Sequence, residues 1–282
     1  MISVEELRDK GKVYTTYPAE LREAVARAME AWQAFCVLPE DIKMQFPYEV
    51  DKWVSGNGYE LKKESGDTLD QKENFHLRLR ARDELLTRAS AIGNPEITEF
   101  VEAGLVLPEL IAPLLADFAQ SMEEEFGMTG FAEDVAYATP SLLLRFLHYF
   151  GDQEPGKEIA SPHVDKGGFT LHLYESDKGV EQLTFDGNWT PVPVSHEQTV
   201  IFPALGLQYR LKSDVKAMCH KVVATEESAQ NGRFSAVCFV DFRGNVPWNK
   251  EKFGRQQDLP PGFNYTMPWE EFKTRFNEDI LS

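Results

Sequence analysis

SPHVDKGGFTLHLY, residues 161–174, is the stretch that decides the fold predicted from the sequence. Its second half, Phe169–Tyr174, follows a Gly167-Gly168 turn and has the composition of a strand. Similar short runs, rich in β-branched and aromatic residues and separated by turns, occur at 141–149, 199–202, 215–223 and 234–242. Several short strands at this spacing predict an all-β sandwich or barrel from about residue 138 onward.

The N-terminal half has a helical pattern instead. Residues 18–38 repeat apolar side chains at spacings of three and four, and Pro18 suits a first helical position. A second helical region covers 95–127, where Pro108 and Pro113 must start, bend or split helices. Residues 53–79, between these regions, are expected to be extended and rich in turns.

The tail, 260–282, begins with Pro-Pro-Gly and ends in a predicted amphipathic helix around Trp269, Phe272 and Phe276. We therefore expect one functional unit in two parts: a helical N-terminal region over 1–135, and a β core with the C-terminal tail over 136–282. A helical layer can cover one side of a curved sheet and leave the barrel mouth as a ligand cavity.

The composition is that of a globular protein with an acidic balance. Of the 282 residues, 42% are hydrophobic and 27% are charged, which argues against disorder. The net charge of −17 comes from 46 acidic and 29 basic residues. Such a charge repels phosphate backbones and anionic membrane surfaces, so we expect neither a nucleic-acid nor a membrane partner. We interpret the charge chiefly as a determinant of solubility.

The cysteine content indicates a reducing compartment. Cys36, Cys219 and Cys238 are an odd number in a long chain, which favours free thiols over a disulfide framework. The first residues lack the basic and apolar regions of a signal peptide, and no apolar run approaches membrane-spanning length. A cytoplasmic monomer is the expectation.

His163, Asp165 and His220 are the candidate metal ligands. Residues i and i+2 of a strand point to the same side, so His163 and Asp165 can share one metal, with His220 supplied by another strand. Two imidazoles and a carboxylate form the facial triad that holds non-haem Fe(II) and leaves positions open, although catalytic zinc is possible on ligand type alone. A single His-x-Asp is a weak motif, so the surrounding sequence must decide whether it indicates a metal site.

Arg233 and Ser235 form a candidate anion site thirteen residues after the last histidine. They share one side of a predicted strand, Arg233–Phe239. An inward guanidinium in an apolar strand is costly unless it meets an anion, and its planar fork suits a carboxylate. The alternative is an arginine that points outward at the start of the strand.

Together, these motifs resemble the isopenicillin N synthase-like branch of the Fe(II)/2-oxoglutarate-dependent oxygenase superfamily. The likeness spans nearly the whole chain. It rests further on Leu144–Phe150 before the first ligand, on Asp165–Leu171 (Asp-x-Gly-x-x-Thr-Leu in the family), on Asp186–Val192 (Asp-Gly-x-Trp-x-Pro-Val), and on Leu38-Pro39, Lys43, Gly58-Tyr59 and Asp70–Phe75 in the N-terminal half.

This resemblance implies a mainly β fold with helices: a double-stranded β-helix, or jelly roll, flanked by N-terminal helices and a C-terminal helix. It implies that Fe(II) is held by His163, Asp165 and His220, and that the cosubstrate 2-oxoglutarate is bound by Arg233, Ser235 and Tyr149. Dioxygen would then oxidise a small-molecule substrate by hydroxylation or desaturation, with release of succinate and CO2. Because the carboxylate ligand is present, halogenation is disfavoured.

The sequence departs from the family pattern at four places. Lys221 follows the distal histidine where arginine is usual, Leu147 replaces a common asparagine, and Phe150 replaces a common proline. The segment 203–206, Pro-Ala-Leu-Gly, replaces the usual Gly-Asp turn before the distal strand. None of these changes removes a ligand. Two alternatives stay open: an isopenicillin N synthase-like oxidase or cyclase that uses Fe(II) and O2 without 2-oxoglutarate, and a metal-binding or sensing jelly-roll protein without catalysis.

Overall fold

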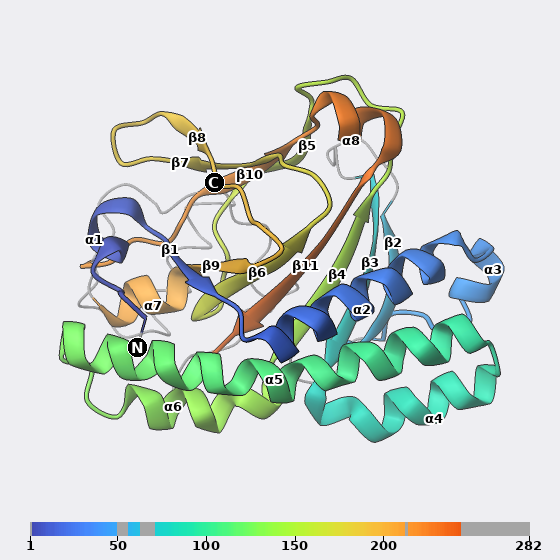
Figure 1. Ribbon diagram of the computed structural model, residues 1–282, viewed down its shortest axis with the longest axis horizontal. Coiled ribbons are helices and arrows are strands. Elements are labelled where there is room, and N and C mark those ends of the chain that lie inside the picture. Colours follow the sequence, from blue (N-terminus) through green and yellow to red (C-terminus); the bar gives the residue numbers. More distant parts are fainter. Residues whose placement is uncertain (1, 50–55, 63–70, 212–213, 244–282) are drawn as a thin grey trace, which may run out of the picture.

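Two antiparallel sheets form the centre of the protein in the computed structural model, which describes residues 2–49, 56–62, 71–211 and 214–243. The larger sheet has the order β1-β9-β6-β11-β4-β3-β2 and the smaller one the order β5-β10-β7-β8. Figure 1 shows the smaller sheet on one side of the larger one and the main helices on the other. This is the architecture of a mainly β protein with helices that the sequence predicts.

The larger sheet takes strands from both halves of the chain. Its order corresponds to β1 (Val13–Thr16), β9 (Gln198–Pro203), β6 (Phe169–Glu175), β11 (Arg233–Val240), β4 (Leu143–Tyr149), β3 (Lys72–Arg78) and β2 (Gly58–Lys62). The smaller sheet contains β5 (Glu158–His163), β10 (His220–Val223), β7 (Val180–Leu183) and β8 (Trp189–Pro191). Residues before 136 therefore add three strands to the β core as well as the helices that cover it.

The helices agree with the periodicity of the sequence. The longer ones are α2 (Ala19–Val37), α4 (Arg82–Ile92), α5 (Pro95–Phe126) and α6 (Phe131–Ala138); the shorter ones are α1 (Glu6–Lys10), α3 (Glu40–Lys43), α7 (Leu205–Arg210) and α8 (Glu226–Asn231). The Asn94 side chain caps α5 by accepting from the Ile97 N–H at 3.0 Å. This helix runs through both Pro108 and Pro113, so neither proline splits it.

Aromatic packing joins the helices to the larger sheet. Trp32 and Phe35 of α2, Phe100 of α5, and Phe75 and Phe146 of the sheet are fully buried and pack with ring centroids 4.9–6.2 Å apart. Burial of side chains this large is worth on the order of 2–3 kcal/mol each. This cluster fixes which face of the sheet meets the helices, and it leaves the opposite face for the site.

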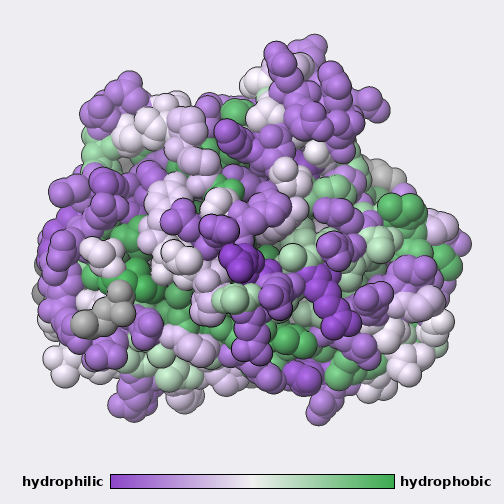
Figure 2. Space-filling model, viewed as in Figure 1, coloured by the Kyte–Doolittle hydropathy of each residue, from purple (hydrophilic) through white to green (hydrophobic). Residues whose placement is uncertain are grey.

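The surface is consistent with the acidic composition. In Figure 2, hydrophilic residues cover most of the visible face and hydrophobic ones form scattered patches. Among the described residues, no helix is both long enough and apolar enough to cross a membrane. The predicted C-terminal helix around Trp269, Phe272 and Phe276 lies outside the described residues.

Candidate metal centre

Two histidines from paired strands meet on the inner side of the smaller sheet. His163 ends β5 and His220 begins β10, and the antiparallel register makes them direct cross-strand partners. Their ring centroids are 4.3 Å apart, and the ring of Phe202 from β9 lies 5.1 Å from that of His220. Strand pairing thus brings together two imidazoles that are far apart in the sequence.

Each imidazole is oriented by a backbone carbonyl. Nδ1 of His163 lies 2.8 Å from the carbonyl oxygen of Ser161, and Nδ1 of His220 lies 3.1 Å from that of Met218. An Nδ1–H that donates to a carbonyl leaves Nε2 with its lone pair, which is the tautomer that a metal requires. Both rings are therefore held in a ligating form.

Asp165 completes the set. Its Oδ1 lies 3.9 Å from His163 Nε2, and the ligand atoms of the three residues all lie within 4.8 Å of one another. Thr170 Oγ1 donates to Asp165 Oδ2 at 2.6 Å, which leaves Oδ1 for a metal. The expected geometry differs in one detail: β5 ends at His163, so Asp165 lies beyond the strand and not on it. The three predicted ligands nevertheless converge.

The electrostatics of the centre favour metal binding. Burial, and then the neighbouring His220, lower the pKa of His163 to about 4, so this ring is neutral near pH 7. Asp165 and His220 are each only 9% exposed. Two imidazoles and one carboxylate, with no thiolate, are a donor set that fits Fe(II) and leaves coordination positions for small molecules.

The predicted anion site lies on the inner face of the larger sheet. Arg233 and Ser235 of β11 are 1% and 3% exposed, so the arginine does not point outward. Tyr149 of β4 is the direct cross-strand partner of Arg233, and the guanidinium carbon lies 6.0 Å from the phenol ring centroid. The three residues predicted to bind the cosubstrate are thus neighbours.

Glu175 of β6 is a site residue that the sequence analysis missed. Arg233 Nη2 donates to Glu175 Oε2 at 2.7 Å, and Arg233 Nε donates to the carbonyl of Asp177 at 2.9 Å. The Val194 N–H donates to the other Glu175 oxygen at 2.7 Å. The available signal was an acidic residue at the end of a strand-like run, which is too common to be diagnostic.

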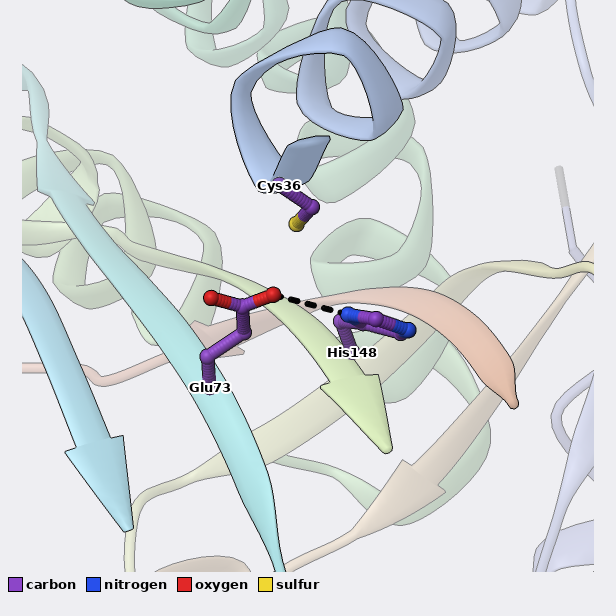
Figure 3. A group of neighbouring side chains, drawn as sticks. All are labelled: Cys36, Glu73 and His148. Atoms are coloured by element: carbon purple, nitrogen blue, oxygen red, sulfur yellow. Dashed lines mark hydrogen bonds and ion pairs between the residues drawn. The ribbon is translucent and has the colours of Figure 1, made fainter. Parts of the chain in front are cut away.

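A second group of potential ligands lies on the helical face of the sheet: Cys36, Glu73 and His148 (Figure 3). Both Glu73 oxygens are already used, because His148 Nδ1 lies 2.8 Å from one, while Lys43 Nζ at 2.5 Å and the Tyr59 hydroxyl at 2.7 Å donate to the other. Burial and the nearby Glu73 raise the pKa of the Cys36 thiol, which disfavours the ligating thiolate. These residues form a hydrogen-bonded network rather than a metal site.

The remaining histidines lie in other surroundings. His148 faces the opposite side of β4 from Tyr149, and His196 is exposed. His172 is 4% exposed on the inner face, where its Nε2 has no hydrogen-bond partner among the described residues. His76 of β3 is buried, with 3% of its surface exposed.

A family model described as the 2OG-Fe(II) oxygenase superfamily matches residues 139–241. The matched part contains the three metal-centre side chains, Tyr149, Arg233 and Ser235. A curated 2-oxoglutarate-dependent dioxygenase from Didymella fabae is 31% identical over 122 residues. That alignment covers 41% of this chain and 36% of the relative, so only about a third of the relative is matched.

Solved structures with the same fold cover most of the chain. A full-length Neurospora crassa protein, crystallised in complex with alpha-KG, superposes with a TM-score of 0.69 at 16% identity and covers 95% of this chain and 83% of that one. Dioxygenase for auxin oxidation 1 from Arabidopsis thaliana, in its 2-oxoglutarate complex, gives 0.70 at 16% identity, covering 88% and 91%. These likenesses confirm the predicted jelly-roll core.

Proposed function

Because residues 139–241 form a domain of the 2OG-Fe(II) oxygenase superfamily, we propose that the protein is an Fe(II)- and 2-oxoglutarate-dependent dioxygenase. It hydroxylates or desaturates a small-molecule substrate and releases succinate and CO2. One observation carries the proposal: His163, Asp165 and His220 each place a ligand atom within 4.8 Å of the other two, while the Nδ1 atoms of both histidines and one oxygen of Asp165 are held by backbone carbonyls and Thr170. Such outer contacts fix ligand orientation in metal sites.

In this proposal, His163, Asp165 and His220 hold Fe(II), which, with 2-oxoglutarate and O2 bound, supplies the oxidising chemistry. The protein positions the reactants. Arg233 and Ser235 bind the distal carboxylate of 2-oxoglutarate, because a buried guanidinium and a hydroxyl on one strand face suit a carboxylate. The Tyr149 phenol, across the strand pair, adds a hydrogen bond.

Anaerobic titration tests the proposal directly. Fe(II) and 2-oxoglutarate added to the apoprotein are expected to produce a visible charge-transfer band. The band should be lost in His220→Ala, which removes a ligand, and in Arg233→Ala, which removes the anion partner. His196→Ala alters an exposed histidine and should leave the band intact. An absent band in wild-type protein with bound iron would refute 2-oxoglutarate binding.

A second candidate is the isopenicillin N synthase-like oxidase or cyclase, which uses Fe(II) and O2 without 2-oxoglutarate. The contact between Glu175 and Arg233 favours it, because the guanidinium already has a carboxylate partner. Succinate release separates the two: a dioxygenase forms one succinate per O2 consumed, whereas the oxidase forms none.

The cellular setting is part of the same proposal. We assign the enzyme to the cytoplasm as a monomer, with no nucleic-acid or membrane partner. The free thiols of Cys36, Cys219 and Cys238 support a reducing compartment, and the net charge of −17 opposes binding to anionic polymers and membranes. A sedimentation measurement that gives twice the chain mass would refute the monomer.

A further inference from the structure

The inner face of strands β2, β3 and β4 carries a group of polar side chains. Alternation along β3 turns Glu73, Phe75 and Leu77 toward the helices, so Asn74 and His76 face the barrel interior. Arg145 of β4 is directly opposite His76, and Glu60 of β2 is directly opposite Asn74. We call Glu60, Asn74, His76 and Arg145 the β3 polar cluster.

Three members of the β3 polar cluster have unsatisfied hydrogen-bonding atoms. Asn74 Oδ1, His76 Nδ1 and Arg145 Nε are buried and have no hydrogen-bond partner within the part of the chain that the structure describes, whereas His76 Nε2 lies 3.3 Å from Glu60 Oε2. The Asn74 and His76 residues are 1% and 3% exposed. A buried polar atom without a partner costs about 1–3 kcal/mol, so such atoms are rare in native interiors unless something binds them.

Glu60 determines which polar atoms are available. Asn74 Nδ2 donates to Glu60 Oε2 at 3.4 Å, which fixes the orientation of the amide and makes Oδ1 the unsatisfied acceptor. Burial, and then the charge of Arg145, lower the pKa of His76 to about 4, so its ring is neutral and has one donor and one acceptor nitrogen. The β3 polar cluster therefore presents an acceptor, a guanidinium donor and a neutral imidazole.

The β3 polar cluster shares the inner face with the metal centre. The guanidinium carbon of Arg145 lies 4.8 Å from the ring centroid of Phe239, whose cross-strand partner Thr170 holds Asp165. Arg145 is opposite Val237, and Val237 is opposite His172, so Thr170 lies two strand spacings across the sheet and two residues along it, about 12 Å away. A molecule anchored at the cluster can therefore reach the metal with a carbon several bonds away from its anchored group.

We propose that the β3 polar cluster binds the substrate through a secondary amide, cyclic or open-chain. The amide carbonyl accepts from Arg145 Nε, and the amide N–H donates to Asn74 Oδ1, with His76 as a further partner. A carboxylate is a poorer match, because it leaves the Asn74 oxygen without a donor. This inference rests on the proposed function for its reaction, but the binding it describes is measured separately.

Fragment binding to the full-length protein tests the inference. The protein is loaded with Mn(II), which does not turn over, and with 2-oxoglutarate, and binding is followed by ligand-observed NMR. Three six-membered-ring probes are compared: 2-piperidone, with both donor and acceptor; N-methyl-2-piperidone, with the acceptor alone; and cyclohexanecarboxylate, an anion. We expect 2-piperidone to bind at least about tenfold more tightly than either of the others.

Variants then assign the contacts. Arg145→Met and His76→Phe keep the side-chain bulk and should weaken 2-piperidone binding by about tenfold or more. Their controls, Arg27→Met and His196→Phe, change exposed residues of the same kinds and should have no effect. Asn74→Leu should abolish the preference for 2-piperidone over its N-methyl derivative. Because Arg145 Nε has no partner among the described residues, the melting temperature of Arg145→Met should stay near the wild-type value, whereas His76→Phe also removes the 3.3 Å contact with Glu60.

Several results would overturn the inference. Stronger binding of cyclohexanecarboxylate would replace the amide with an anion, and no binding of 2-piperidone to wild-type protein would exclude the site. A large fall in melting temperature with unchanged probe affinity would make the β3 polar cluster structural. The charge-transfer band reports on the proposed function separately: if it forms and 2-piperidone does not bind, only the present inference fails. If it does not form and 2-piperidone still binds selectively, the binding site stands without that function.

Discussion

Arg233 and Glu175 form an ion pair on the inner face of the larger sheet, with Nη2 and Oε2 2.7 Å apart and side chains 1% and 2% exposed. Burial outweighs the attraction of Arg233 and raises the pKa of the Glu175 carboxyl. An anion that binds Arg233 must therefore share the guanidinium with an internal carboxylate. The charge at this anion site is largely compensated before any ligand arrives.

Glu175→Gln should make the thermal stability of the protein depend more strongly on bound 2-oxoglutarate. Removing one charge of a buried pair leaves Arg233 uncompensated and costs roughly 3–5 kcal/mol of stability. The ligand carboxylate then supplies the missing negative charge, so 2-oxoglutarate should raise the melting temperature of Mn(II)-loaded Glu175→Gln more than that of wild type. Glu197→Gln, at an exposed position, is the control. Equal ligand-induced shifts in Glu175→Gln and wild type would show that Glu175 does not share Arg233 with the cosubstrate.

Thr170→Val should weaken metal binding without altering the fold. The hydroxyl donates to Asp165 Oδ2 at 2.6 Å and so directs Oδ1 toward the metal. Loss of such an outer contact typically lowers metal affinity by about 10–100-fold. Calorimetric titration of the apoprotein with Mn(II) measures the change, and Thr87→Val, whose hydroxyl bonds a helix carbonyl at an exposed position, is the comparison. An unchanged affinity in Thr170→Val would mean that Asp165 is oriented by the backbone alone.

The convergence of His163, Asp165 and His220 could be predicted from the sequence, because their residue types and order match a family pattern. Helix α2 and strands β4, β6, β9 and β11 could be predicted, because apolar periodicity and strand-like composition mark them in the sequence. Strand β3 shows where this fails. All seven of its residues are buried, although only Phe75 and Leu77 in the order KENFHLR are apolar.

Glu73 and Asn74 explain the failure in physical terms. Glu73 is buried on the face toward the helices, where Lys43, Tyr59 and His148 satisfy its carboxylate, and Asn74 is buried on the opposite face, directly across from Glu60 of β2. Both environments come from segments distant in sequence. The pairing of Arg233 with Glu175 was missed for the same reason, since it depends on β6 lying beside β11.

Glu73→Gln should reveal a pH-dependent contribution to stability from the network in Figure 3. Although burial acts to raise the pKa of this carboxyl, hydrogen bonds from His148, Lys43 and Tyr59 lower it from 4.5 to about 2. Because the pKa is lower in the folded state, the ionised carboxylate stabilises the protein at pH values above the unfolded-state pKa of 4.5. This stabilisation is lost as the pH falls toward 2.

Urea unfolding at pH 7, 5 and 3 measures this contribution. Wild type should exceed Glu73→Gln by roughly 3 kcal/mol at pH 7 and 5, and about half of that difference should vanish at pH 3. Glu23→Gln tests the effect of replacing an exposed carboxylate. A difference between wild type and Glu73→Gln that stays constant from pH 7 to pH 3 would show that the ionised carboxylate contributes nothing specific.

Gly232→Ala should damage both stability and cosubstrate binding, because this glycine precedes Arg233 at a close approach of two strands. Its φ is +78°, and an added Cβ would lie 2.7 Å from the Tyr149 carbonyl oxygen. Gly187 separates the two effects: its φ is +86°, but no atom lies within 4 Å of an added Cβ. Gly187→Ala should therefore cost only the conformational term of about 1–2 kcal/mol. Gly232→Ala should lower the free energy of unfolding in urea by more than this. Because the substitution displaces the start of β11, and with it Arg233, it should also weaken the affinity for 2-oxoglutarate measured by calorimetry. Equal losses of stability in the two variants, with unchanged 2-oxoglutarate affinity, would mean that the Tyr149 carbonyl moves aside without disturbing the anion site.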